Sequence, residues 1–360
     1  MSSTVWETQK LGGEEARLSM DMPPRTLLYS LDPIGIGTPM VECFTSYDMR
    51  LAGEYDLSIK QLAAIAISGN LNPGDDVVRF LWNTYVLDGV SDRAALWVPA
   101  FERATGRTDI RYLTLLPFRA AIPQMDLLSR HRKWCARCLE EWKLSRNPVY
   151  EPLLWRFEAV NVCTVHQIYL TSKCPRCHRQ SQILGFYSHP GYCQHCQSWL
   201  GTRDGTTSAP TEFSDECSIG RNIGELLKLL PHADPDSIRA TLRQNLRVYC
   251  DQLATGNVSA LADYIGHGHS NVSTWLDGTQ VPRFKFLLDI SKRFSVPLAR
   301  LFDPRGPTSA DIDRAKESIR ASAPRNAYTF RRADEIKAAL VRAAEDPTRP
   351  SLLEVARQLG

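Results

Sequence analysis

The chain has 360 residues, of which 43% are hydrophobic and 23% charged, a composition typical of soluble globular proteins with two or three domains. The first twenty residues lack the apolar stretch of a secretory signal, and no apolar run reaches membrane-spanning length. This pattern excludes the secreted and membrane classes and predicts a cytoplasmic protein. In that reducing compartment we expect closely paired cysteines, among the ten that the chain contains, to bind metal rather than to form disulfides.

The net charge of +3 is unevenly distributed along the chain. Residues 1–129 carry a net charge of −5, residues 130–200 carry +6, and residues 237–305 carry +4. This polarity would be explained by an acidic N-terminal half that binds protein and a basic C-terminal half that binds phosphate. Ordinary solvated faces would explain it equally well.

Regular apolar spacing predicts helices near the N-terminus. After a polar lead-in, residues 57–68 and 91–104 repeat apolar side chains every three or four positions. Ser58 and Asp92 are the expected N-caps, and Pro99 is expected to kink or split the second helix. The N-terminal region is therefore predicted to be a small helical domain.

Four short doublets of metal-binding residues occupy the middle of the chain. They are Cys135-x-x-Cys138, Cys163-x-x-His166, Cys174-x-x-Cys177 and Cys193-x-x-Cys196. A gap of two residues lets both side chains of a doublet reach one metal, and two doublets complete a tetrahedral shell. The spacing predicts two structural Zn²⁺ ions, with no coordination position left for catalysis.

The spacing leaves the pairing of the doublets open. The first doublet pairs with the second in a sequential arrangement and with the third in a cross-braced one. His178 and His195 lie beside predicted ligands, and either could replace one of them. The remaining cysteines, Cys43, Cys217 and Cys250, are isolated and are expected to be buried apolar side chains.

Residues 258–302 have the pattern of a helix-turn-helix. Two short apolar stripes flank the turn Gly266-His267-Gly268, and Gly278 is expected to end the second helix. The stretch resembles the helix-turn-helix of Cro/Xre-type phage repressors, although the recognition helix contains no Lys or Arg. The predicted DNA-binding residues are His269, Ser270, Asn271, Ser273 and Thr274 on that helix, with Arg283 and Lys285 as phosphate contacts.

Composition divides the rest of the chain. Helical periodicity runs from Ile223 to Leu246, and residues 306–327 have the composition of a connection. Residues 331–344 and 351–359 have the pattern of two short amphipathic helices, and residues 349–360 resemble the first part of another, incomplete helix-turn-helix. We expect a mainly α, multidomain fold with small zinc-ribbon or zinc-finger elements. Its expected parts are a helical domain (1–129), a zinc module (130–200), a linker with a helix (201–236), a helix-turn-helix domain (237–305) and a C-terminal helical segment (306–360).

The doublets and their context resemble one protein family. Cys135-Ala-Arg-Cys138 comes after a basic stretch, Trp155-Arg156 precedes Cys163-Thr-Val-His166, and Cys174-Pro-Arg-Cys177 follows. With the N-terminal segment LDPIGIGTPMVECFTSYDMRLA (31–52), these motifs resemble the TniQ/TnsD family over roughly residues 25–200. This family comprises target-selection proteins of Tns-type bacterial transposons, including CRISPR-associated ones.

The resemblance implies a non-enzymatic adaptor associated with the bacterial nucleoid. Such proteins bind double-stranded DNA at an attachment site or dock onto a CRISPR effector complex, and they recruit the AAA+ transposition ATPase, a TnsC- or TniB-like protein. The eight doublet residues would be the zinc ligands, and the acidic N-terminal domain is our candidate for the ATPase-docking surface. The oligomeric state, a homodimer included, stays open.

Other functions remain alternatives at this stage. A zinc-containing transcriptional regulator would use the same two modules, but such a regulator usually carries a charged reading helix. An enzyme is disfavoured because the sequence contains no phosphate-binding loop, zinc-protease motif or nucleophile elbow. Two alternatives remain. One is a nuclease whose carboxylates are distant in the sequence, and the other is a zinc-stabilised scaffold that does not contact DNA.

Overall fold

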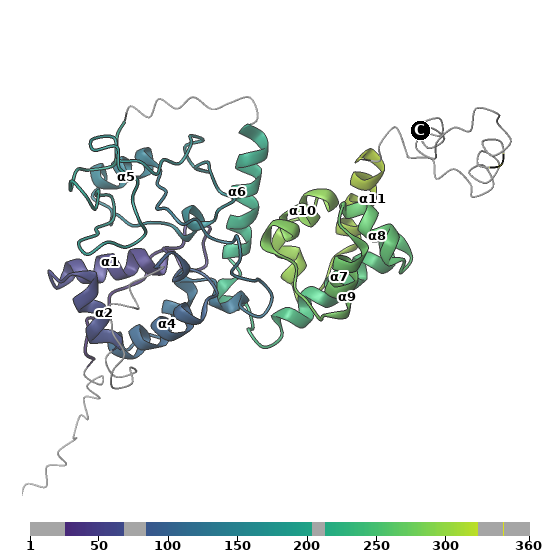
Figure 1. Ribbon diagram of the computed structural model, residues 1–360, viewed down its shortest axis with the longest axis horizontal. Helices are drawn as coiled ribbons and strands as arrows, with labels where there is room; N and C mark the ends of the chain where they lie inside the picture. The colour runs from purple at the N-terminus through teal and green to yellow at the C-terminus, as the bar shows by residue number, and fades with distance from the viewer. Residues whose placement is uncertain (1–25, 68–83, 204–212, 323–340, 342–360) are drawn as a thin grey trace, which may run out of the picture.

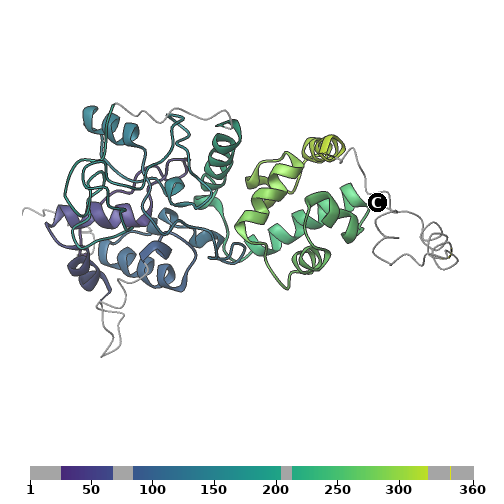
Figure 2. The same cartoon turned by 45° about the horizontal axis from the view of Figure 1, so that its top comes forward.

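Helices build both lobes of the structure, a computed structural model that describes residues 26–67, 84–203, 213–322 and 341 (Figure 1). The larger lobe contains the N-terminal helices and the Cys/His-rich region, and the smaller lobe contains the helices from α7 onward (Figures 1 and 2). Within the described residues, extended pairing is limited to isolated bridges such as Val162 with Tyr169. The predicted mainly α fold class is confirmed.

Three helices form the framework of the larger lobe: α1 (Phe44–Glu54), α2 (Ile59–Ile67) and α4 (Asp92–Thr105). The last two confirm the predicted helices 57–68 and 91–104. The α1 helix overlaps the end of the segment 31–52, for which no helix was predicted. Eight of its eleven residues are buried, so it lacks the polar stripe from which amphipathic spacing is recognised.

The helix caps agree with the prediction at one position and differ at another. Ser58 Oγ accepts a hydrogen bond from the Gln61 amide at 3.3 Å, as expected of an N-cap. At α4 the cap is Ser91, whose Oγ accepts from the Ala94 amide at 3.1 Å, while Asp92 is the first helical residue. The predicted split at Pro99 does not occur, because α4 continues through it to Thr105.

A buried ion pair joins distant segments of the larger lobe. Asp88 accepts hydrogen bonds from the amide and the hydroxyl of Thr45 on α1, both at 2.8 Å. It also pairs with Arg156 Nε at 2.8 Å, and both charged side chains are buried. Because removing one partner would leave an uncompensated buried charge, this pair holds the N-terminal helices against the Cys/His-rich region. Among the residues of this lobe that the structure describes, the short 3₁₀ helices are η2 (Thr84–Val86), η3 (Ile110–Leu113), η4 (Leu116–Phe118) and η5 (Leu153–Arg156).

The helix α6 (Phe213–Leu227) runs along the larger lobe on the side that faces the smaller one (Figure 1). A Cβ at Gly224 would lie 2.9 Å from Pro39 Cβ, so only glycine allows this close approach. The predicted continuous periodicity from Ile223 to Leu246 is divided between α6 and α7 (Ile238–Ala254). Between them lie η6 (Leu230–His232) and two prolines, Pro231 and Pro235, which cannot donate helical hydrogen bonds.

The smaller lobe consists of α7, α8 (Val258–Ile265), α9 (His269–Asp277), α10 (Phe284–Phe294), η7 (Leu298–Phe302) and α11 (Ser309–Ser322). Aromatic pairs connect it to the larger lobe. The ring centroids of Phe118 and Phe302 lie 5.2 Å apart, and those of Phe157 and Phe284 lie 5.1 Å apart. Asn222 on α6 donates a hydrogen bond to Ser291 Oγ and accepts one from the Leu298 amide.

The segment 306–327, predicted to be a connection, contains the helix α11. Thr308 and Asp311 form a reciprocal cap at its start, in which each side chain accepts a hydrogen bond from the other's amide. Only a few apolar residues, including Ile312 and Ala315, are buried, so the apolar pattern was too sparse to reveal the helix.

Some predictions lie outside the described residues: most of the lead-in, the short helices over 331–344 and 351–359, and the incomplete motif at 349–360. Within the described ranges, none of the helices combines the length and hydrophobicity that a bilayer crossing requires.

Candidate metal centres and nucleic-acid interface

The eight doublet residues gather into two groups. Cys135, Cys138, Cys163 and His166 form the first group, and Cys174, Cys177, Cys193 and Cys196 form the second. Within each group all candidate ligand atoms lie within 4.8 Å of one another. The structure therefore has the sequential pairing and not the cross-braced one. His178 and His195 belong to neither group.

Distances in the first group match those of a tetrahedral metal shell. Cys138 Sγ lies 3.6 Å from Cys163 Sγ and 3.1 Å from His166 Nδ1, and Cys135 Sγ lies 3.5 Å from the same Nδ1. Metal–sulfur bonds of about 2.3 Å at tetrahedral angles place two sulfurs about 3.8 Å apart. Hydrogen bonding from Cys135, then from Cys138, lowers the pKa of Cys163, while hydrogen bonding with Cys135 and Cys163 raises the pKa of Cys138.

Glu141 supports the histidine of the first group. Its carboxylate lies 2.8 Å from His166 Nε2, so the ring can donate that proton while Nδ1 faces the thiols. No pattern in the sequence indicated this residue, because the contact depends on the helix α5 (Ala136–Leu144). The first doublet opens this helix: Cys135 is the N-cap, and its sulfur accepts from the Cys138 amide.

Three of the doublets share one backbone conformation. The residue that follows each of them has a positive φ: 54° at Gln167, 57° at His178 and 56° at Gln197. In each case its amide donates to the carbonyl of the first doublet residue at 2.9 Å. This turn directs both side chains of a doublet toward one point, and it occupies His178 as a turn residue rather than a ligand.

The second group is more exposed than the first. Cys174 Sγ lies 3.7 Å from Cys196 Sγ, and Cys177 Sγ lies 3.7 Å from Cys193 Sγ, again close to a tetrahedral edge. Cys177 and Cys196 are half-buried, whereas all three cysteines of the first group are buried. Both groups can hold a metal through four protein ligands, an arrangement that stabilises a fold and leaves no open position for catalysis.

Part of the positive charge of residues 130–200 is carried by side chains that bond within the protein. Arg132 is buried, paired with Glu151, and donates to the carbonyls of His189 and Tyr192. Lys133 donates to the carbonyls of Phe157 and Val160, and burial lowers its pKa to about 8. The charge surplus of this region therefore overstates its capacity to bind phosphate. The three isolated cysteines, Cys43, Cys217 and Cys250, are buried as predicted.

The predicted helix-turn-helix consists of α8 and α9. Gly266 and Gly278 end these helices with φ angles of 73° and 83°, which glycine adopts without strain. Val272, Trp275 and Leu276 face the core of the lobe. Of the proposed reading residues, His269, Ser270 and Asn271 are exposed, while Ser273 and Thr274 are half-buried.

The two proposed phosphate contacts differ in their surroundings. Both residues lie at the start of α10 and are exposed. Arg283 lies 3.7 Å from Asp126 of the larger lobe, a partly screened ion pair, whereas Lys285 has no ion pair within the described part of the chain. Lys285 is therefore the freer of the two.

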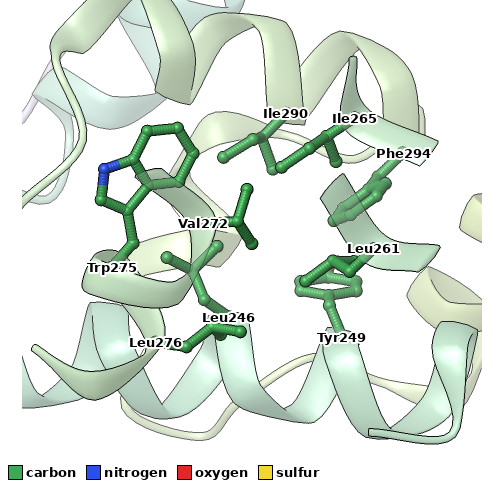
Figure 3. Close-up of a pocket in the computed structure, with 9 residues that line it drawn as sticks. All are labelled: Leu246, Tyr249, Leu261, Ile265, Val272, Trp275, Leu276, Ile290 and Phe294. Carbon is green, nitrogen blue, oxygen red and sulfur yellow. The ribbon is translucent and has the colours of Figure 1, made fainter. Parts of the chain in front are cut away.

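A small cavity lies in the core of the helix-turn-helix, between α7, α8, α9 and α10 (Figure 3). Its volume is about 10 Å³, which is at the lower limit for a single water molecule. The lining is apolar: Leu246, Tyr249, Leu261, Ile265, Val272, Trp275, Leu276, Ile290 and Phe294. This space is a packing defect and not a small-molecule site.

Comparison with protein families found a match to the TniQ family over residues 33–170. No curated protein matches the chain. The matched segment contains α1, α2, α4, α5 and the first Cys/His group, and it ends before the second group begins at Cys174. TniQ family proteins are non-catalytic transposition proteins with a role in the selection of transposon targets. Residues 33–170 of this chain are therefore a TniQ family domain.

Proposed function

We propose that this chain is a target-site selection adaptor of a Tns-type transposon. It binds target DNA or a guide-RNA effector complex and recruits the AAA+ ATPase that brings the transposase. One observation supports this function above the others: buried aromatic pairs pack the TniQ domain against the lobe that contains the helix-turn-helix. A single body of this kind can hold a bound target at a fixed position relative to a recruited partner.

The two Cys/His groups hold structural Zn²⁺ in this proposal. Three thiolates with one imidazole, and four thiolates, are donor sets that zinc prefers. The sulfur–sulfur distances of 3.6 and 3.7 Å fit its bond lengths. When bound, the ions supply folding free energy to a region whose described residues contain only one regular helix, α5.

The exposed start of α9 is the proposed reader of DNA. His269, Ser270 and Asn271 present hydrogen-bonding groups there, and an asparagine side chain is suited to adenine. Lys285 supplies a phosphate contact beside it.

The ATPase-docking surface is placed at the end of α1. The acidic surplus of the N-terminal region is partly internal, since Glu42, Asp48, Asp88 and Glu102 are buried. Glu54 and Asp56 are exposed and have no ion pair among the described residues. They lie beside Tyr55, which is also exposed, and a partner with basic side chains would fit this surface.

The experiment that tests the function is the selection of bound duplexes from a random DNA library with zinc-loaded protein. Enrichment of one motif that is lost in Asn271→Ala would support direct reading by α9. Binding without enrichment would assign target choice to a partner such as an effector complex. No binding, to DNA or to an effector complex, would contradict the adaptor function.

Docking of the ATPase is tested separately by Glu54→Lys combined with Asp56→Asn, the asparagine being tolerant of the positive φ of 52° at that position. We expect at least a tenfold loss of ATPase recruitment, with DNA affinity unchanged. Asp92→Asn is the matched control, since Asp92 is also exposed but is paired with Arg119. Loss of both activities, or of neither, would refute this assignment of the surface.

A further inference from the structure

Three arginines form a row on α7 beside the end of the recognition helix. Arg239, Arg243 and Arg247 recur every four residues, so they lie on one face of the helix, and all three are exposed. Among the residues that the structure describes, none of the three forms an ion pair with a carboxylate. Asp277 lies nearby: hydrogen bonds from Thr279 are the main cause of its lowered pKa, and the charges of Arg243 and Arg247 lower it further. We call this set the α7 arginine row.

Main-chain carbonyls at the end of α9 fix the row in place. Arg239 Nη2 donates to the Gly278 carbonyl at 2.7 Å. Arg243 Nε and Arg247 Nε donate to the Leu276 carbonyl at 3.0 and 2.7 Å. Each guanidinium has five N–H donors, so these bonds orient the side chain and leave most of the donors for a ligand.

Gly278 makes room for the row. A Cβ at this position would lie 3.0 Å from Arg243 Cδ and 3.2 Å from Arg243 Nε. The glycine therefore serves the turn after α9 and also allows the middle arginine to lie against it.

The length of α9, which separates the start of this helix from the arginine row, is close to the width of the DNA major groove. The nine residues of α9 span about 13 Å at 1.5 Å per residue, and the groove is about 12 Å wide. If the start of α9 reaches base edges inside the groove, the row at the other end of this helix lies about one helix length away, where phosphates border the groove. Oriented guanidinium groups bind phosphates in bidentate fashion.

We propose that the α7 arginine row is a phosphate-binding surface for duplex DNA and supplies the charge that the recognition helix lacks. This inference rests on the proposed DNA contact of the helix-turn-helix and assigns its main electrostatic anchor to the preceding helix. The row adds backbone affinity for any sequence, while the start of α9 contributes base contacts.

The test is the salt dependence of binding to a duplex of random sequence, measured with the zinc-loaded full chain between about 50 and 200 mM salt. In Arg239→Gln/Arg243→Gln/Arg247→Gln the charges are removed, while the amide N–H groups at positions 243 and 247 replace the Nε–H donors and can still bond to the Leu276 carbonyl. The bond from position 239 to the Gly278 carbonyl, which Arg239 makes through Nη2, is lost. We expect the slope of log affinity against log salt to become shallower by about 0.9 for each phosphate that the variant no longer neutralises. The triple lysine variant keeps the charges and should keep most of the slope.

Two further measurements separate the possible failures. Thermal unfolding of both triple variants shows whether they remain folded without the arginine bonds to the α9 carbonyls. If the glutamine variant is unfolded, single glutamine variants replace it, and each should make the salt slope shallower by about 0.9. An unchanged slope in folded glutamine variants would overturn the arginine row while leaving the DNA contact of α9 intact. Absence of salt-dependent binding in the wild type would instead overturn the proposed DNA contact itself.

Discussion

At the scale of single residues, many charged side chains are buried in the core and do not contribute to a binding surface. Arg156 and Asp88 pair in the core, Arg132 pairs with Glu151, and Asp48 is buried without a hydrogen-bond partner among the described residues. The sequence shows how many charges a segment contains but not which are buried, because burial depends on contacts between residues that are distant along the chain. The segment charges of −5 and +6 therefore include side chains that are buried and cannot act on a surface.

Asp48 provides a prediction at this scale. Burial and, after it, the charge of Asp88 raise the pKa of Asp48 well above its usual value, and neither carboxyl oxygen is hydrogen-bonded within the part of the chain that the structure describes. A carboxyl whose pKa is raised on folding stabilises the native state fully at a pH below its unfolded pKa. That contribution is lost, by up to about 1.4 kcal/mol per pH unit, as the pH rises toward the folded pKa.

We expect Asp48→Asn to remove this contribution, so that its free energy of unfolding falls less between acidic and mildly alkaline pH than that of the wild type. Urea unfolding at several pH values measures the difference. The exposed Asp92→Asn serves as the control and should follow the wild-type pH dependence. An identical pH dependence in Asp48→Asn and the wild type would show that Asp48 is not buried as described.

At the scale of secondary structure, the sequence predicted elements well where a local signal determines them. The apolar spacing identified α2, α4, α8 and α9, and the doublet spacing identified the eight residues of the two Cys/His groups. The α1 helix was missed because nearly all of it is buried, and α11 because only a few of its apolar residues contact the core. Glu141 and the α7 arginine row were missed because their roles depend on which helix ends lie beside them.

Gly278 provides a prediction for the end of α9. Any side chain there meets both a φ of 83° and the close approach of Arg243. Gly256 has a similar φ of 78°, but a Cβ there would have only ordinary contacts, the nearest being Asp251 Oδ1 at 3.6 Å. We expect Gly256→Ala to lower the free energy of unfolding by about 1 to 2 kcal/mol and Gly278→Ala to lower it by at least about 1 kcal/mol more.

Urea unfolding of the two variants measures this difference directly. Because the backbone strain is nearly the same at both sites, the excess reports the contact with Arg243. Equal losses in the two variants would mean that Arg243 moves away at no cost, which would also weaken the case for a fixed arginine row.

At the scale of the whole molecule, the Cys/His region connects the other parts. Arg156 from this region pairs with Asp88, Phe157 contacts Phe284 of the smaller lobe, and α6 packs against η5. The first Cys/His group packs with Trp134 and Trp155 in a buried cluster that also contains Cys174 and Cys193 of the second group, and Trp155 directly precedes Arg156. Because half of the second group is only partly buried, the two proposed zinc ions should contribute unequally to the stability of the chain.

Paired ligand variants test this inequality. Cys138→Ser and Cys177→Ser each remove one of four ligands, and each should reduce the zinc content from two ions to one per chain. We expect Cys138→Ser to lower the unfolding temperature of the whole protein and to abolish DNA binding, because loss of the first site disturbs the core between the lobes. Cys177→Ser should unfold its own module while the helical lobes still melt near the wild-type temperature. Equal destabilisation by both variants would contradict a dominant first site, and an unchanged zinc content in either would exclude that cysteine as a ligand.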